Sequence, residues 1–457
     1  MLMSALFQPF VEQSPLSVMA RLTIDRALRP QLLNDLFERT AQRQYTEDLL
    51  FSSTVDLMSL VVCGSVKHVK AGFERIKERI PVTLKCVYEK LQRMETHVSE
   101  ELVRFSSDQC QTILRELNGA LPDPLPGYRV RILDGNCLAG TEKRIKQLRG
   151  HTAAALPGKS LVVMDPALMQ ITDVVFCEDG HTQERELLPR LVQLICAKDV
   201  WVADRNFCVI DWMVELSDRK AFFVIRRHRQ VTIESEHEWS EEVETATGWV
   251  SERRSSVKRA GSWELDVRVI RVRLKAPTRD GEGVVEILTN LPGSVSAVQV
   301  ALMYLGRWKI ETAFQELTVY LNCELNTLGY PKAALFGFAV AITAYNIQSV
   351  LKGALRSVHG AEKIEEELSG YYVATEWAAV ITGMLIALPP EFWAEYSQLS
   401  DHEFAELLKE LAKKVRLDRF RKQKRSPKKK PTPKIRDGVP HRSTAKVLRE
   451  AREKKNA

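Results

Sequence analysis

The chain has 457 residues, of which 45% are hydrophobic and 27% are charged. This length predicts about three domains, or one large domain with appendages, and the composition excludes wholesale disorder and fibrous repeats. The longest weakly polar stretches, 333–345 and 377–388, are shorter than the roughly 18 apolar residues that cross a bilayer. The N-terminal segment also lacks the features of a secretory signal. We therefore expect a cytoplasmic protein.

The net charge of +7 is unevenly distributed along the chain. Residues 413–457 carry 19 Lys and Arg against 4 Asp and Glu, a net charge of +15 that leaves −8 for the remainder. This basic tail is too rich in charge and proline to bury a core, so we expect it to be disordered alone. Its charge indicates a polyanionic partner, nucleic acid rather than membrane, with Lys428, Lys429 and Lys430 as candidate DNA contacts. The eight Cys lack metal-ligand spacing, so we expect no structural zinc.

The first 120 residues are predicted to form a helical N-terminal domain that binds DNA. Apolar residues recur with a period near 3.6 from residue 14 to about residue 117, which is typical of amphipathic helices. Two helical stretches within this region are broken at Ile80-Pro81. They are open to two interpretations. In one interpretation they are a helix-turn-helix that presents basic side chains to DNA. In the other they are a helical hairpin whose charged side chains face solvent. The candidate DNA contacts are Lys85, Lys90 and Arg93.

A Pro-rich boundary at 121–127 precedes a change of period, and residues 121–360 are predicted to form a mixed α/β domain. Short runs rich in β-branched residues alternate with helical segments in the order β-β-β-α-β-α-β, which resembles the ribonuclease H-like fold. The predicted strands are 128–136, 160–165, 171–177, 199–204 and 221–226, and the predicted helices between them are 181–198 and 207–217.

The polar and alternating segments of residues 229–293 predict an inserted β-subdomain. Its tryptophans, Trp239, Trp249 and Trp263, either stack on an extruded base or belong to the core of the subdomain. After the insertion, Ser294 or Ser296 is expected to cap one long helix through Leu321. Further helices are expected to follow, with residues 361–412 as C-terminal helices ahead of the tail.

Three carboxylates are predicted to converge in this domain. Asp134 and Asp204 end two strands that the derived topology makes parallel neighbours, so both lie at the same edge of the sheet. Glu311 shares one face of the long helix with Tyr304 and Arg307 at about 100° per residue. Acidic oxygen ligands without Cys or His favour Mg²⁺ or Mn²⁺. Two such ions would clamp the attacking and leaving oxygens of a phosphodiester.

Each of these residues alone has an ordinary structural explanation. An Asp at a strand end commonly caps a turn, and Arg307 and Glu311 have the spacing of an i,i+4 ion pair. The combination is more informative, because the strand order, the two strand-end carboxylates and the Tyr/Arg/Glu face agree. Arg307 can offer a bidentate fork to a phosphate, and Tyr304 a hydroxyl group.

The segments ILDGN, VADRNF and YLGRWKIETAFQEL resemble the catalytic motifs of DDE transposases from bacterial insertion sequences, in the branch whose third motif has the Tyr-Arg-Glu-Lys signature. The resemblance covers about 128–350. It implies that Asp134, Asp204 and Glu311 bind two Mg²⁺ or Mn²⁺ ions and catalyse cleavage, and that Tyr304 and Arg307 contact phosphates of the transposon end. It also implies cut-and-paste transposition with double-stranded DNA, both terminal inverted repeats and target, by a homodimer on paired ends.

One position departs from that signature, because Thr318 stands where the resemblance implies Lys. The nearest basic candidates to replace that phosphate contact are Lys309 and Lys332. The sequence therefore predicts a metal-dependent DNA transposase. The alternative is a DNA-binding protein derived from a transposase that has lost catalytic activity.

Overall fold

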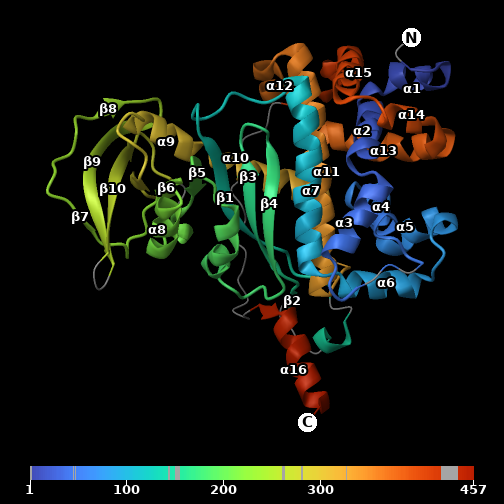
Figure 1. The fold of residues 1–457 in the computed structure, drawn as a ribbon, viewed down its shortest axis with the longest axis horizontal. Helices are drawn as coiled ribbons and strands as arrows, with labels where there is room; N and C mark the ends of the chain where they lie inside the picture. Colours follow the sequence, from blue (N-terminus) through green and yellow to red (C-terminus); the bar gives the residue numbers. More distant parts are fainter. Residues whose placement is uncertain are drawn as a thin grey trace.

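The computed structural model describes residues 3–44, 46, 48–142, 145–149, 155–259, 263–278, 281–325, 327–423 and 441–456. Figure 1 shows a helical part, coloured blue at its N-terminal end, beside a long twisted sheet, with helices from the C-terminal third returning to the helical part. The chain is thus a mixed α/β protein with a helical N-terminal region, as predicted.

The N-terminal region is entirely helical in its described part. The break at Ile80-Pro81 falls between η2 and α6, as predicted, and Asn118 ends α7 in the left-handed conformation with φ 50°. The elements are η1 (Ala5–Phe7), α1 (Gln8–Gln13), α2 (Pro15–Ala27), α3 (Pro30–Thr40), α4 (Phe51–Val62), α5 (Val69–Ile76), η2 (Lys77–Arg79), α6 (Leu84–Arg93) and α7 (Thr96–Leu117).

The five predicted strands of the α/β domain are all present, and they form one half of a mixed sheet. The first three pair antiparallel in the order β4-β3-β1, and β1 then pairs parallel with β5, which pairs parallel with β6. The bounds are β1 (Arg129–Cys137), β3 (Lys159–Asp165), β4 (Gln170–Cys177), β5 (Asp199–Ala203) and β6 (Phe222–Arg226). The carboxyl ends of β1, β5 and β6 therefore lie at the same edge.

The β-rich insertion extends this sheet instead of forming a sheet of its own. β11 pairs antiparallel with β6, so the order continues as β6-β11-β10-β9-β7 in a ten-stranded sheet. The predicted β-subdomain is thus continuous with the sheet of the α/β domain, because β6 leaves an edge that β11 covers. Its strands are β7 (Ile233–Glu234), β8 (Val243–Glu244), β9 (Gly248–Arg259), β10 (Trp263–Leu274) and β11 (Val284–Thr289).

The connections that follow β4 and β5 are short helices. The predicted helix 181–198 is the 3-10 helix η4 (Glu184–Leu194), and Pro189 inside it lacks the backbone N–H that an α-helix needs. After β5 come η5 (Arg205–Phe207) and α8 (Ile210–Asp218). These helices cover the sheet face that carries Leu133, Ala203 and Ile225.

The expected single helix after the insertion is two helices, α9 (Ala297–Leu305) and α10 (Trp308–Tyr320). Ser296 caps α9 with a full capping box, which confirms one of the two expected caps. The break falls at Gly306 and Arg307, between the Tyr and the Glu of the third motif. Chain direction therefore changes within the segment that bears the candidate phosphate contacts.

Helix α11 (Pro331–His359) forms the centre of the helical part. By length and composition it could cross a membrane, with a mean hydropathy of 1.5 over its most apolar window, but that window is completely buried inside the protein. It packs against α7, α15 and α2, so helices from both ends of the chain share one core. The remaining helices are η3 (Lys146–Leu148), α12 (Ala361–Glu367), α13 (Gly370–Ala387), η6 (Pro390–Phe392), α14 (Ala394–Ser397), α15 (Asp401–Lys414) and η7 (Leu417–Phe420).

Helices α7 and α11 cover the outer edge of β4 (Figure 1). The Glu100 side chain on α7 accepts a hydrogen bond of 2.7 Å from the backbone N–H of Phe176. The Asn346 amide on α11 accepts from the N–H of Ile171 and donates to its carbonyl, both at 2.9 Å. Buried side chains thus satisfy backbone groups that an edge strand leaves unpaired.

The basic tail differs from the expected disorder in its described part. β12 (Arg442–Ser443) pairs parallel with β2 (Ala155–Leu156), and helix α16 (Thr444–Asn456) follows. Val447 is the reason for this order, because it packs in a small apolar cluster with Ile145 and Leu148. The candidate DNA contacts Lys428, Lys429 and Lys430 lie outside the described residues.

Candidate active site

Asp134 and Asp204 are brought together by the register of two parallel strands. Leu133 on β1 lies opposite Ala203 on β5. Asp134 directly follows Leu133, and Asp204 directly follows Ala203, so the two aspartates are neighbours in the same register. Neighbouring strands lie about 4.8 Å apart, and side chains at the same register point to the same face. The topology predicted from the sequence therefore places the two carboxylates side by side.

The Asp204 carboxylate also fixes the turn that follows β5. It is the N-cap of η5, and its Oδ1 accepts a hydrogen bond of 2.6 Å from the backbone N–H of Asn206. The turn role expected for an isolated strand-end Asp is thus present. It leaves the second carboxylate oxygen, Oδ2, for another ligand.

Glu311 reaches the same edge through Arg307. The Arg307 guanidinium donates to Asp134 Oδ2 at 2.8 Å and to Glu311 Oε1 at 2.7 Å, so it bridges the two carboxylates. This arrangement depends on the break before α10, because Arg307 stands at the N-terminal end of that helix and Glu311 lies in its first turn. The i,i+4 ion pair predicted from the spacing is therefore present, with a third partner from β1.

The charge on Asp134 is unfavourable in its surroundings. Burial raises the pKa of its carboxyl group from 3.8 to about 7, against the opposing effect of Arg307. The neighbouring charges of Asp204 and Glu311 also raise this pKa. The three carboxylates thus interact electrostatically, and added positive charge would stabilise the ionised form of Asp134.

The donor chemistry of this group fits a hard divalent cation. Carboxylate oxygens are the ligands that Mg²⁺ and Mn²⁺ prefer, and the raised pKa of Asp134 is the result expected where negative charge is incompletely neutralised. In this structure the Arg307 guanidinium supplies the positive charge. Within the described part of the chain, no group of three or more Asp, Glu, His or Cys is close enough together to hold a metal ion.

Tyr304 and Arg307, the candidate phosphate contacts, both lie at this edge. Arg307 uses two of its nitrogens for carboxylates, and its buried Nε has no hydrogen-bond partner among the described residues. Burial raises the pKa of Tyr304, and the charges of Arg307 and Asp204 act on its hydroxyl group. Both side chains are thus beside the aspartates, and their contact with a phosphate stays a prediction.

The sequence analysis missed a fourth carboxylate near the aspartates, that of Glu184 at the start of η4. A Cβ on Gly135 would lie 2.2 Å from the Glu184 Cδ, so Glu184 packs against β1 at Gly135, on the face opposite to the Asp134 side chain. Glu184 Oε2 also accepts a hydrogen bond of 2.7 Å from Asn206 Nδ2. Residue spacing in the sequence does not indicate this contact, because Glu184 lies 49 residues after Gly135 and 22 before Asn206.

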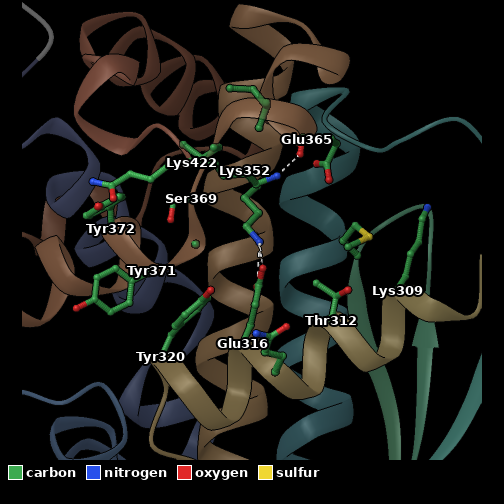
Figure 2. A pocket seen from close by; sticks show the side chains of 16 residues that line it. Lys309, Thr312, Glu316, Tyr320, Lys352, Glu365, Ser369, Tyr371, Tyr372 and Lys422 are labelled. Atoms are coloured by element: carbon green, nitrogen blue, oxygen red, sulfur yellow. Dashed lines mark hydrogen bonds and ion pairs between the residues drawn. The ribbon is translucent and has the colours of Figure 1, made fainter. Parts of the chain in front are cut away.

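The residues weighed as substitutes for the missing Lys point elsewhere. Thr318 lies on the same face of α10 as Glu311 and is exposed, with its hydroxyl group 3.8 Å from Cys323 Sγ. Lys309 donates to the Pro166 carbonyl at 3.2 Å and lines a pocket of 710 Å³ on another face of α10 (Figure 2). Lys332 lies 3.9 Å from Glu178. These contacts direct both lysines away from Glu311.

The three candidate DNA contacts of the helical region all lie on α6, which Thr83 caps at its N-terminus. Lys85 is exposed and lies 3.8 Å from Glu89, and Arg93 is exposed at the end of the helix. Lys90 packs over the Phe37 ring at 4.2 Å. Two of the three side chains are therefore on the surface, and their binding to DNA stays a prediction.

Two tryptophans of the insertion pack under arginine side chains. The guanidinium of Arg271 lies 3.7 Å from the centre of the Trp239 ring, and that of Arg273 lies 4.1 Å from the Trp249 ring. These are cation-π contacts on the surface of the sheet. In this structure both rings are thus covered by protein.

The comparisons with known proteins point to transposases. Residues 125–347 match the family described as the transposase DDE domain. The chain is 26% identical over 122 residues to a protein of Sinorhizobium fredii (strain NBRC 101917 / NGR234) named "Putative transposase y4zB". That match covers 27% of this chain and 34% of the relative, so the chain spans about a third of the length of that relative.

Among solved structures, the chain is similar to a piggyBac transposase synaptic complex with hairpin DNA, with a TM-score of 0.40 and 12% identity, covering 84% of this chain and 82% of that one. The family match contains Asp134, Asp204 and Glu311, and it confirms the resemblance stated from the sequence. Residues 125–347 of this chain, just under half of its length, are thus similar to the transposase DDE domain family.

Proposed function

We propose that this protein is a DNA transposase that cleaves phosphodiester bonds at transposon ends and transfers the ends into target DNA. The observation that carries the proposal is the placement of Asp134, Asp204 and Glu311 at one edge of the sheet, inside the matched family. We infer that the order β4-β3-β1-β5-β6 is a ribonuclease H-like arrangement with an added β-region.

In this proposal the three carboxylates hold two Mg²⁺ or Mn²⁺ ions. The ions would activate the attacking water or 3′-hydroxyl group and neutralise charge on the leaving oxygen. Asp134 must be ionised to take part, so its proton leaves when the cation binds. Arg307 must release at least one carboxylate, and its fork then faces the edge where the phosphate lies.

The cut-and-paste course of the reaction and the homodimer on paired ends belong to the proposal on the strength of the resemblance. Double-stranded DNA is the proposed partner, with terminal repeats and target bound in turn. The excess positive charge of residues 413–457 supports a polyanionic partner. A DNA substrate also fits the cytoplasmic location expected from the sequence.

One observation favours the alternative of a DNA-binding protein without catalytic activity. No basic side chain stands at position 318, and Lys309 and Lys332 are turned to other partners. A weakened phosphate contact would slow cleavage. In the alternative the carboxylates are present but catalyse nothing. Their removal would then change no cleavage activity, whereas the proposal predicts that cleavage is lost.

Cleavage of a labelled DNA duplex that carries the inverted repeats bracketing the coding region tests the proposal. We expect Mg²⁺-dependent nicking by the wild-type protein and its loss in Asp204→Asn and Glu311→Gln. Asp218→Asn is the matched control, because Asp218 is an exposed carboxylate at the end of α8. Equal melting temperatures would exclude unfolding as the cause.

Nicking by a folded Asp204→Asn variant at the wild-type rate would contradict the proposal. A wild-type protein that binds the repeats and never cleaves them would favour the alternative.

A further inference from the structure

The row of residues that begins with the two aspartates continues onto a third strand. Ala203 on β5 lies opposite Ile225 on β6, so Arg226 follows in register beside Asp204. Asp134, Asp204 and Arg226 therefore stand at successive positions across three parallel strands. Their side chains share one face of the sheet, about 4.8 Å from one strand to the next. The acidic edge of the sheet thus becomes basic one strand further on.

A pocket of 820 Å³ opens at this basic end. We call it the arginine pocket and define it by four arginines and two glutamates among its lining residues: Arg205, Arg226, Arg227, Arg229, Glu282 and Glu286. Arg205 comes directly after Asp204, and Arg226 is the last residue of β6. The arginine pocket is therefore continuous with the carboxylate edge.

Glu282 faces three of these arginines at once. Its carboxylate accepts a hydrogen bond from Arg226, lies 3.1 Å from Arg205 and lies 3.9 Å from Arg229. The Arg226 hydrogen bond is the main cause that lowers the pKa of Glu282, so this carboxylate is ionised at neutral pH. One negative charge is thus set against three guanidinium groups, which leaves the cluster with excess positive charge.

The second glutamate is shared in the same way. Glu286 accepts from Arg227 at 2.6 Å and from Arg271 at 3.0 Å, which holds the loop after β6 against β11. Arg227 also donates to the Val231 carbonyl at 3.1 Å. Arg227 therefore supports the wall of the pocket, whereas Arg229, with a side chain that is 92% exposed, is open to a ligand.

Tyr304 connects the arginine pocket to the carboxylates. The charges of Arg307, Arg226 and Asp204 all act on its hydroxyl group, so Tyr304 is near residues of both sites. Helix α9, which ends at Leu305, packs on both β5 and β6. A strand of DNA whose phosphate lies at the aspartates would meet Tyr304 next and the arginine pocket after it.

We propose that the arginine pocket binds a DNA phosphodiester group one or two nucleotides from the one cleaved, and that Glu282 holds the arginines in place until that phosphate displaces it. The proposal rests on the function proposed above. Arg guanidinium groups donate paired hydrogen bonds to phosphate oxygens. When the phosphate replaces Glu282, the arginines exchange one carboxylate for an anion with more oxygen acceptors.

The affinity for a short fluorescent DNA duplex, measured in EDTA over a range of salt concentrations, tests this inference apart from cleavage. We expect Arg226→Gln and Arg229→Gln each to weaken binding about tenfold and to reduce the slope of log affinity against log salt by about 0.9, the value for one lost phosphate contact. Glu282→Gln removes the competing carboxylate, so it should bind DNA severalfold more tightly.

Arg219→Gln is the matched control. Arg219 pairs with Glu215 at 2.5 Å, has a side chain as exposed as that of Arg205, and follows α8 at the opposite edge of the sheet. Its affinity and slope should equal those of the wild-type protein. Because Arg229 is on the surface, its replacement keeps the test valid if Arg226→Gln does not fold.

Wild-type slopes in Arg229→Gln and in folded Arg226→Gln would overturn the inference and leave the proposed function standing. A wild-type protein that bound no DNA would overturn both. Weakened DNA binding in the arginine variants, with normal loss of cleavage in Asp204→Asn, would support both.

Discussion

At the scale of single residues, the site is organised by one guanidinium group between two carboxylates. Arg307 neutralises Asp134 and Glu311 in this structure, yet the pKa of Asp134 is still raised to about 7. The bridging contacts therefore do not compensate for burial and for the neighbouring negative charges. A residue with these properties binds cations at the expense of a proton.

This balance predicts a pH-dependent stability in metal-free buffer. Because the folded chain raises the pKa of Asp134 from 3.8 to about 7, the protonated carboxyl group stabilises the fold below about pH 4. That contribution is lost as the pH rises through about 7. The Asn side chain in Asp134→Asn cannot ionise, so this variant does not lose that contribution. Its free energy of unfolding should therefore rise relative to that of the wild-type protein as the pH increases between these values, by up to ~4 kcal/mol.

Chemical denaturation of both proteins across that pH range, with EDTA present, measures the difference. Asp218→Asn controls for the loss of one surface carboxylate. Parallel pH profiles for the wild-type protein and Asp134→Asn would mean that the Asp134 carboxyl group titrates normally.

The three carboxylates could be found from the sequence because each follows a regular local rule. Asp134 and Asp204 follow apolar, β-branched runs, and Glu311 shares a predicted helix with Tyr304 and Arg307 at a spacing that brings the three onto one face. The bridging role of Arg307 could not be found, because it depends on the helix break at Gly306. Glu184 and Arg226 reach the site through tertiary packing and strand register, which residue spacing alone does not encode.

At the scale of elements, the edge of the sheet near the helical region is closed by side chains instead of another strand. Asn346 on α11 replaces the missing strand by satisfying both backbone groups of Ile171. Glu100 on α7 does the same for the N–H of Phe176. The run of β-branched residues in 171–177 predicted β4, but neither cap has a sequence signal, because each acts over a long sequence separation.

Replacing Asn346 with Leu should therefore destabilise the protein. The substitution keeps the side-chain volume similar but leaves a buried N–H and a buried carbonyl of Ile171 unpaired, at about 1–3 kcal/mol each. We expect the free energy of unfolding to fall by ~2–5 kcal/mol, measured by denaturant titration.

Gln348→Leu on the same helix is the matched control. Gln348 is equally buried, but its amide oxygen and nitrogen have no hydrogen-bond partner among the residues that the structure describes. Removing that amide should leave stability unchanged or raise it. Equal losses from both substitutions would show that the Asn346 hydrogen bonds do not stabilise β4.

The other differences between expectation and structure at this scale have the same origin. Strand and helix types were predictable from periodicity. The split of the long helix into α9 and α10, and the 3-10 geometry of η4, depend on single residues, Gly306 and Pro189. The joining of the insertion to β6 depends on which edge is free, which only the assembled sheet determines.

At the scale of the whole molecule, the sheet separates acidic and basic side chains along one edge. Asp134 lies on β1 where its pairing with β5 ends and Asp204 directly follows β5, whereas arginines stand at the end of β6 and in the loops beside it. The helical regions from both ends of the chain share a core on the opposite side of β4. This plan supports a DNA strand that runs along the edge, with the reacting phosphate at one end of its contacts.

The central claim is that Asp134, Asp204 and Glu311 act as one divalent-cation site in the full-length chain. Equilibrium binding of Mn²⁺, followed by electron paramagnetic resonance without DNA, tests it most directly. We expect binding by the wild-type protein and by Asp218→Asn, and at least about tenfold weaker binding by Asp134→Asn, Asp204→Asn and Glu311→Gln. Wild-type Mn²⁺ affinity in a folded Asp204→Asn variant would contradict it.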